Sequence, residues 1–399
     1  MAKAPRGERL IIAIVGKRNA GKSSLINAIT GQQTSIVSDI AGTTTDPVAK
    51  HYELLPLGPV TFYDTAGFDD VGELGEKRIK ATYKILWKSD IAVIVIDEKG
   101  MDENDYKVID KVKELKIPFV IVFNKSDIKK AKDNDKKYCD KNGLQYIEVS
   151  SKTGENINSL KEKIISLSPK ELKRERALLA DLIKEGETVI LVVPIDLAAP
   201  KGRLILPQVQ AIREILDSDA ISVVVKEREL ESVLNNLKSK PSIVITDSQA
   251  VLKVSADVPN DIPLTTFSIL FARYKGDLKE LTDGANKIDK LKDGDRVLIA
   301  EACSHHVQAD DIGRVKIPRW LLQYTGKELK IDIASGSDYP ENLEEYSLII
   351  HCGGCMLNRM EMMRRIKESL RRKISITNYG VAISKLQGVL ERVIKPFYG

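Results

Sequence analysis

Residues 10–30 limit the possible folds of this chain more than any other stretch. An apolar run, Leu10–Val15, leads directly into Gly-Lys-Arg-Asn-Ala-Gly-Lys-Ser at 16–23, which matches the phosphate-binding pattern G-x-x-x-x-G-K-[ST]. Glycines let successive backbone amides face phosphate groups, Lys22 brings a positive charge to the β- and γ-phosphates, and the Ser23 hydroxyl can bind Mg²⁺. The pattern predicts a strand, a loop and a helix around a nucleotide. The predicted binding residues are Gly16, Asn19, Ala20, Gly21, Lys22, Ser23 and Ser24.

Two further motifs follow apolar runs that read as strands. Asp-Thr-Ala-Gly at 64–67 comes after Val60–Tyr63, so Asp64 can hold Mg²⁺ through water and the Gly67 amide can contact the γ-phosphate. Asn-Lys-Ser-Asp at 124–127 ends the run Phe119–Phe123. Its final carboxylate can accept hydrogen bonds from both the N1–H and the exocyclic amine of guanine, an arrangement that adenine does not offer. This motif therefore selects GTP, through Asn124, Lys125 and Asp127.

Two more motifs complete a set of five. Ser150, Ser151 and Lys152 follow the apolar run Tyr146–Val149 and resemble the last guanine-contacting loop of GTP-binding proteins. Gly-Thr-Thr-Thr-Asp at 42–46 lies in a polar stretch where a switch threonine would reach Mg²⁺, with Thr44 the first choice and Thr43 the second. With the five motifs in order, residues 8–168 resemble a Ras-like GTPase, and the Gly-Thr-Thr-x-Asp switch resembles the tRNA-modification GTPase branch. The residues expected to serve GTP hydrolysis are Lys22, Thr44, Asp64 and Gly67.

Two positions bear on how GTP would be hydrolysed. Ras-like proteins usually place a water-orienting glutamine just beyond the glycine of the second motif, whereas this chain has Phe68 there. Hydrolysis must therefore recruit help from elsewhere. By resemblance to the tRNA-modification branch, Asn19 could bind a K⁺ ion that bridges the phosphates. The alternative is that an asparagine at this position only tolerates the backbone geometry of the loop.

Length and composition bound the rest of the chain. At 399 residues it is too long for one ordinary core, and we expect three α/β domains with mostly parallel sheets. No apolar run approaches the ~20 residues that span a bilayer, and the first nine residues lack an apolar signal core. We therefore expect a cytoplasmic protein with no membrane role. A net charge of +5, with acidic residues interleaved throughout, gives little support to a nucleic-acid partner.

The middle of the chain, residues 169–272, predicts a charged linker helix and then a small α/β domain. The helical, charged composition extends from Ser168 to Lys184, and apolar strands are expected at Val189–Pro194, Ile221–Val225 and Ser242–Thr246. The domain contains no histidine or cysteine and no catalytic constellation. We expect it to pack against a second copy of itself and to form a homodimer.

The last part, residues 273–399, carries three of the four cysteines and three of the four histidines in two short clusters. Cys-Ser-His-His at 303–306 follows the expected strand Arg296–Ala300, and His-Cys-Gly-Gly-Cys at 351–355 follows Tyr346–Ile350. Because the carboxyl ends of parallel strands share one edge of a sheet, the two clusters can meet there. Reduced cytosolic thiols favour metal binding over disulfides, so the sequence predicts a metal site.

The residues alone leave the metal open. Three cysteines and a histidine would satisfy tetrahedral Zn²⁺. A four-iron cluster would have only Cys303, Cys352 and Cys355 as thiolate ligands, because Cys139 lies in the nucleotide-binding domain. Its fourth iron would bind an exchangeable small molecule or one of the side chains His305, His351, Asp310 and Asp311, with His306 a weaker candidate.

Taken together, the GTPase motifs, a C-x-H motif, and H-C-x-x-C after a long spacer resemble the HydF family, the GTPases of [FeFe]-hydrogenase maturation. The resemblance covers essentially the whole chain. It implies a scaffold and carrier that binds a [4Fe-4S] cluster, receives a diiron precursor made by two radical-SAM maturases, and delivers it to apo-[FeFe]-hydrogenase. It implies a GTP-binding domain (1–168), a dimerisation domain (169–272) and an iron–sulfur cluster domain (273–399). It also implies cluster ligand roles for Cys303, Cys352 and Cys355, with His305 and His351 as site histidines whose binding to iron is left open.

Two other functions fit parts of the sequence. An RNA-modifying or ribosome-associated GTPase with a structural Cys₃His zinc site would explain the likeness to the tRNA-modification branch. It needs a basic, aromatic-bearing surface, and only 5% of the residues are aromatic. A metal-sensing switch, in which GTP hydrolysis reports the state of a cluster, is the third possibility.

Overall fold

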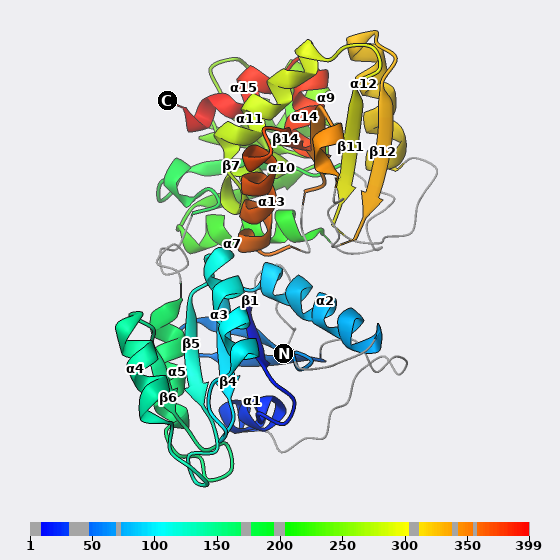
Figure 1. The fold of residues 1–399 in the computed structure, drawn as a ribbon. Helices are drawn as coiled ribbons and strands as arrows, with labels where there is room; N and C mark the ends of the chain where they lie inside the picture. The colour runs from blue at the N-terminus through cyan, green and yellow to red at the C-terminus, as the bar shows by residue number, and fades with distance from the viewer. Residues whose placement is uncertain are drawn as a thin grey trace. The chain divides into compact units, whose positions relative to one another are not determined.

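The protein is described by a computed structural model that covers residues 9–31, 48–68, 73–168, 177–194, 204–302, 311–336, 342–353 and 357–398. It divides into two compact units, Met1–Glu175 and Arg176–Gly399. Both units consist of mostly parallel strands connected by helices, which confirms the expected α/β class (Figure 1). Within the described ranges, no helix is both long and apolar enough to cross a membrane.

The first unit is built around a single sheet. Its strands are β1 (Leu10–Gly16), β2 (Val48–Leu54), β3 (Gly58–Asp64), β4 (Ile91–Ile96), β5 (Phe119–Phe123) and β6 (Tyr146–Glu148). Its helices are α1 (Lys22–Thr30), α2 (Glu73–Lys88), α3 (Glu103–Glu114), α4 (Asp133–Lys141) and α5 (Ile157–Leu167). In the described residues the strand order is β2-β3-β1-β4-β5-β6, and β2 alone runs antiparallel to its neighbour. This is the Ras-like topology expected from the sequence.

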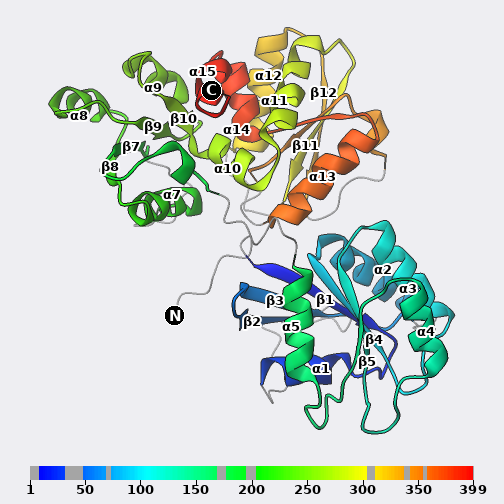
Figure 2. The same cartoon turned by 90° about the vertical axis from the view of Figure 1, so that its left-hand side faces the viewer.

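Helices cover both faces of this sheet, which explains the apolar character of its central strands. Side chains of α1 and α5 pack on one face, and side chains of α2, α3 and α4 pack on the other (Figure 2). Every residue of β4 is buried as a result. The carboxyl ends of β1, β3 and β4 lie side by side, because β1 pairs in parallel with both other strands.

The second unit contains two sheets. The first consists of β7 (Thr188–Val192), β8 (Ile221–Val225), β9 (Ile243–Thr246) and β10 (Leu264–Thr266), and the second of β11 (Arg296–Glu301), β12 (Lys330–Ser335), β13 (Leu348–His351) and β14 (Ser375–Asn378). The described strands follow the orders β10-β9-β7-β8 and β12-β11-β13-β14, all parallel. The helices are α7 (Leu206–Asp217), α8 (Leu230–Asn236), α9 (Val251–Asp257), α10 (Phe267–Lys275), α11 (Leu278–Asn286), α12 (Ile317–Thr325), α13 (Arg359–Arg371), α14 (Tyr379–Leu386) and α15 (Leu390–Ile394).

The two sheets of the second unit share a core. One hydrophobic cluster contains Ile190 and Val244 from the first sheet together with Leu298 and Ile376 from the second. Helices α10 and α11 contribute buried side chains to the same cluster. The expected division of this half at residue 272 stays a prediction, because the apolar core runs continuously across it.

The prediction of a linker helix is wrong for residues 177–184, the part of this segment that the structure describes. Residues 177–184 contain only a short 3₁₀ turn, Ala180–Leu182, and Leu178, Leu179 and Ile183 are buried against α7 and α10. The Glu214 carboxylate of α7 accepts a hydrogen bond from the backbone N–H of Leu178 at 2.8 Å. These apolar residues gain more by packing into the core than by following the helical composition of their neighbours.

Candidate functional site

The phosphate-binding loop joins β1 to α1 and has a backbone that requires glycine at two positions. Gly16 has φ +154°, and a Cβ atom there would lie 2.3 Å from the carbonyl oxygen of Val95 in β4. Gly21 has φ +88°, and a Cβ atom there would lie 2.3 Å from Nδ2 of Asn124. The loop is therefore held between the end of β4 and the guanine-binding motif, with no room for a side chain at either glycine.

Three residues predicted to act on phosphate and Mg²⁺ lie together. Lys22 is buried, and its Nζ donates hydrogen bonds to the carbonyl oxygens of Gly16 at 2.9 Å and Lys17 at 2.7 Å. The Ser23 hydroxyl donates to the Asp64 carboxylate at the end of β3. Burial raises the pKa of Asp64 above its ordinary value, against the opposing effect of the Ser23 hydrogen bond. A hydroxyl and a carboxylate in contact beside a lysine form a donor set that suits Mg²⁺ and phosphate.

The segment after Asp64 is fixed on the sheet. Thr65 donates its hydroxyl to the carbonyl oxygen of Ile14 at 2.9 Å, and Gly67 is buried. Phe68, at the position where Ras-like proteins usually have a water-orienting glutamine, packs edge-on against Tyr83 of α2 with ring centroids 5.6 Å apart. Its side chain therefore serves the core. The switch threonines Thr43 and Thr44 lie outside the described residues.

The guanine-binding motifs form one hydrogen-bonded unit with the phosphate loop. The buried side chain of Asn124 donates to the carbonyl oxygen of Ala20 at 2.9 Å and accepts from the N–H and hydroxyl of Ser151 at 3.1 and 2.8 Å. Asp127 is exposed, and the Ser150 hydroxyl donates to its Oδ1 at 2.6 Å. This hydrogen bond at Oδ1 orients the whole Asp127 carboxylate, including its second oxygen, Oδ2.

Two of the predicted residues adopt the left-handed backbone region. Lys125 has φ +61°, and its Nζ lies 2.8 Å from Oε2 of Glu98. Asn19 is exposed with φ +58°, a conformation that asparagine tolerates better than most residues. The backbone alone thus gives a reason for Asn19, and its binding of K⁺ stays a prediction. Ser24 and Lys152 are exposed.

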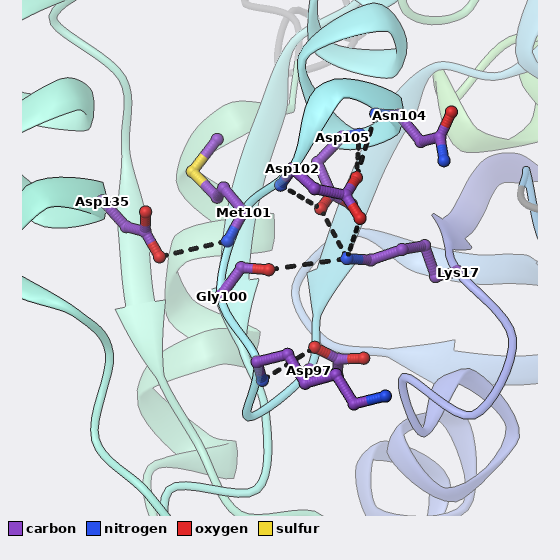
Figure 3. A network of polar contacts seen from close by, with 9 residues as sticks. Lys17, Asp97, Gly100, Met101, Asp102, Asn104, Asp105 and Asp135 are labelled. Carbon is purple, nitrogen blue, oxygen red and sulfur yellow. Dashed lines mark hydrogen bonds and ion pairs between the residues drawn. The ribbon is translucent and has the colours of Figure 1, made fainter.

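The sequence did not reveal that Lys17, inside the phosphate loop, is anchored to the start of α3. Its Nζ lies 2.9 Å from Oδ2 of Asp102 and 3.0 Å from Oδ2 of Asp105, and donates to the Gly100 carbonyl oxygen at 3.5 Å (Figure 3). Asp102 and Asp105 also form the capping box of α3. The Asp-x-x-Asp spacing before this helix was the available signal, but the contact joins residues 85 positions apart.

Charge in this network is distributed unevenly. Burial would lower the pKa of Lys17, but its hydrogen bonds to Asp102 and Asp105 raise it above the ordinary value. For Asp102, burial acts upward and the hydrogen bond from Lys17 brings the pKa below its usual range. Burial raises the pKa of Asp105 to about 6, against the hydrogen bond from Lys17. As the pH falls, Asp105 therefore takes up a proton before Asp102 does. The ion pair between Lys17 and Asp102 persists at a pH where Asp105 is already neutral.

In the second unit, the ends of strands β11 and β13, which lead into the two cysteine clusters, lie side by side. Ala300 of β11 is the register partner of His351 in β13. The backbone N–H of Ala302 donates to Sγ of Cys352 at 3.1 Å, and the N–H of Cys352 donates to the carbonyl oxygen of Ala300 at 2.9 Å. Cys303, His305, Cys355, His306 and Asp310 lie outside the described residues. Within the described ranges, no group of three or more His, Cys, Asp or Glu side chains could hold a metal ion.

The two described candidates for the fourth iron already have hydrogen-bond partners. His351 is fully buried, with Nδ1 at 2.6 Å from the Cys352 carbonyl oxygen and Nε2 at 2.8 Å from Nη1 of Arg365. Because arginine only donates, Nε2 accepts and Nδ1 carries the proton. Burial and the Arg365 charge lower the pKa of His351 to about 3, so the ring is neutral. Iron binding at His351 would require one of these bonds to break, and Asp311 caps the following helical segment by accepting from the N–H of Arg314.

The phosphate loop, the Mg²⁺-type donor set and the guanine-binding motifs on a Ras-like sheet define the first unit as a P-loop GTPase domain. A family model described as a 50S ribosome-binding GTPase matches residues 11–125. The hydrogen maturase F dimerization domain matches residues 178–276, and the hydrogen maturase F tetramerization domain matches residues 279–396. These last two models together cover more than half of the chain. The chain belongs to the hydrogen maturase F (HydF) family, which confirms the resemblance, and both models indicate that it self-assembles.

Curated relatives that are GTPases match part of the chain. GTPase Der of Wolinella succinogenes is 37% identical over 166 residues, which are 39% of this chain and 35% of the relative. The tRNA modification GTPase MnmE of Carboxydothermus hydrogenoformans is 33% identical over 180 residues, which are 44% of this chain and 38% of the relative. The chain thus spans well under half the length of either protein. Among solved structures, Era of Aquifex aeolicus bound to GDP·AlF₄⁻ aligns with 23% identity and a TM-score of 0.36, over 56% of this chain and 97% of that one.

Proposed function

We propose that this protein is a GTP-hydrolysing scaffold and carrier that binds a [4Fe-4S] cluster and delivers a diiron precursor to apo-[FeFe]-hydrogenase. The observation that carries the proposal is the hydrogen bond from the Ala302 N–H to the Cys352 thiol at 3.1 Å. It joins the residue that precedes Cys303 to the first cysteine of the C-x-x-C motif. Two stretches that are 50 residues apart in sequence thus meet at one sheet edge.

The chemistry around Cys352 suits an iron–sulfur group. Backbone N–H donors to cysteine sulfur are among the features that tune such clusters. Arg365 is almost fully buried, contacts His351 at 2.8 Å and pairs with the buried Glu361 at 3.4 Å, so its charge is shared between Glu361 and the end of β13, from which the cysteine loop continues. Cys303, Cys352 and Cys355 would hold the cluster, whose remaining iron position supplies a site for an exchangeable ligand.

GTP would act through the first unit. In this proposal Lys22 neutralises charge on the β- and γ-phosphates, Ser23 and Asp64 hold Mg²⁺, with Thr44 as the switch ligand, and Asp127 selects guanine. The Gly67 amide and the segment around Thr44 would respond to the γ-phosphate and change how partner proteins dock. The partners we propose are apo-[FeFe]-hydrogenase and two radical-SAM maturases. K⁺ bound at Asn19 would replace the charge that an arginine finger supplies elsewhere.

A homodimer through the first sheet of the second unit is part of the proposal. Strand β8 is at the edge of the described sheet, next to β7 only. Its Ile221 and Val224 are 54% and 46% exposed. Val209 and Leu216 of the neighbouring α7 are 48% and 54% exposed. An exposed apolar edge strand is a site for pairing with another chain, which supports self-association at β8.

Anaerobic reconstitution with iron and sulfide tests the cluster. We expect about four iron atoms per chain in the wild type and a strong loss of iron in each of Cys303→Ser, Cys352→Ser and Cys355→Ser. Cys139→Ala is the matched control, because this thiol is buried among the apolar side chains of α3 and β5 in the first unit. Colourless protein that holds one zinc ion and no iron would refute the carrier and favour the RNA-associated GTPase with a zinc site.

A further inference from the structure

The register of the second sheet brings a tyrosine beside the cysteine loop. Strand β13 lies between β11 and β14, and His351 is the partner of Ala300 on one side and of Asn378 on the other. The chain continues from these three positions to Glu301, Cys352 and Tyr379. Since the strands are parallel, these next residues all lie at the carboxyl edge of the sheet, where ligands of such sheets bind. Figure 1 shows β11 and β14 with α14, the helix that Tyr379 begins.

The hydroxyl of Tyr379 is buried and has no hydrogen-bond partner among the described residues. Its ring is partly buried and packs against the cluster that contains Ile317, Ile350 and Ile383. A buried hydroxyl without a partner costs free energy, and it is uncommon enough to call for an explanation. A hydrogen-bond acceptor that is not among the described atoms would explain the unpaired hydroxyl.

The surroundings of this hydroxyl are shaped to admit it. A Cβ atom on Gly313 would lie 2.0 Å from the Tyr379 oxygen and 3.1 Å from Oε1 of Glu301. The nearby Glu301 carboxylate is already used, because its Oε2 accepts from Nη2 of Arg314 at 2.7 Å and from the hydroxyl of Ser335 at 2.8 Å. Glycine at 313 thus leaves room for a hydroxyl that the neighbouring carboxylate does not engage.

The hydroxyl also keeps its proton. A tyrosine with its ordinary pKa of about 10 is protonated at neutral pH, and burial acts in the same direction. The buried hydroxyl is therefore a hydrogen-bond donor. Its natural acceptor is an electron-rich atom at the same sheet edge.

We infer that the Tyr379 hydroxyl donates a hydrogen bond to a sulfur atom, thiolate or sulfide, of the iron–sulfur group that Cys352 helps to hold. The inference rests on the proposed function. Tyr379 is then a positioning residue that tunes the cluster, in addition to the backbone N–H of Ala302. A donor to sulfur withdraws electron density and stabilises the reduced cluster, so its removal makes the reduction potential more negative.

Tyr379→Phe in the full-length protein, reconstituted anaerobically with iron and sulfide, tests this role. The matched control is Tyr324→Phe, which removes a hydroxyl that donates to Asp289 at 2.8 Å at the surface of the same unit. We expect unchanged iron content and a more negative reduction potential in a redox titration followed by electron paramagnetic resonance, with no change in the control. Iron loss from Tyr379→Phe also supports the inference when the apo-protein melts at the wild-type temperature, because the hydroxyl is then needed to keep the cluster.

Two results would overturn the inference. One is a Tyr379→Phe protein with wild-type iron content, potential and resonance spectrum, which leaves the proposed function intact. The other is joint loss of iron and of apo-protein stability, which assigns the hydroxyl a packing role. A wild type that takes up no iron refutes the proposed function and this inference together.

Discussion

Replacing Asp105 with asparagine should change the way in which the stability of the first unit depends on pH. The Asp105 side chain is 2% exposed and lies 3.0 Å from Nζ of Lys17, while Asp102 forms the second contact of the same ammonium at 2.9 Å. One lysine therefore faces two carboxylates. Burial disfavours the charged form of Asp105, whereas the more exposed Asp102 stays ionised and paired with Lys17.

The size of the effect follows from the shift in pKa. Burial raises the pKa of Asp105 from an ordinary value of 3.8 to about 6. The folded protein thus holds this proton more tightly than the unfolded chain by roughly two pH units, or roughly 3 kcal/mol. The stabilisation is fully present below the unfolded pKa of 3.8 and is lost as the pH rises through about 6. Above that value the asparagine variant, which is neutral at every pH, should gain roughly 2.5 kcal/mol relative to its difference from wild type at pH 4, because an unfolded aspartate is already partly ionised at pH 4.

Tryptophan fluorescence can follow the first unit by itself. Trp87 lies in α2 and Trp320 in α12, so a Trp320→Phe background leaves a single reporter in the GTPase domain. Urea unfolding at several pH values between 4 and 7, with and without Asp105→Asn, gives the difference in unfolding free energy at each pH. Asp110→Asn is the control, because Asp110 is on the exposed side of the same helix. A difference that does not vary with pH would refute the assignment of the proton to Asp105.

Three further predictions concern the nucleotide site. Gly21→Ala should weaken GTP binding about tenfold or more in a calorimetric titration, since its Cβ would lie 2.3 Å from Nδ2 of Asn124; wild-type affinity would contradict the close packing of the loop against this side chain. Asp127→Asn should weaken GTP binding roughly 10- to 150-fold and improve binding of xanthosine triphosphate; equal losses for both nucleotides would show that Asp127 does not read the base. GTP turnover should be faster in potassium than in sodium buffer, and equal rates would rule out the K⁺ site at Asn19.

The positions of four motifs of the nucleotide site could be predicted from the sequence, because each of these four lies at the end of an apolar run, whereas the switch threonines lie in a polar stretch outside the described residues. A strand that ends in a polar motif delivers that motif to the carboxyl edge of the sheet, whatever the rest of the chain does. Contacts of Lys17 with Asp102 and Asp105 escaped prediction for the opposite reason. They depend on how β1 and the start of α3 approach one another, which no local spacing encodes.

His351 shows the limit of inference from residue type. The sequence places it directly beside Cys352, where a histidine is a reasonable metal ligand. In the structure its two ring nitrogens form hydrogen bonds with the Cys352 carbonyl oxygen and with Arg365 of α13. The burial of Arg365 could not be predicted, because the sequence of α13 is rich in charged residues. An arginine buried beside a neutral histidine fixes the tautomer of that histidine. Its contribution to the site would then be to orient the cysteine loop.

Sheet topology alone does not decide where a site forms. Both sheets of the second unit are four-stranded and parallel in the described residues, so each offers the same kind of carboxyl edge. Residues 178–276, which include the first sheet, contain no histidine or cysteine. This sheet instead exposes apolar side chains on β8. In the second, the N–H of Ala302 donates to the thiol of Cys352, and Tyr379 follows the neighbouring strand β14 at the same edge. Under the proposed function, the same architecture serves self-association in one sheet and ligand binding in the other, and the residues just beyond the strands make the difference.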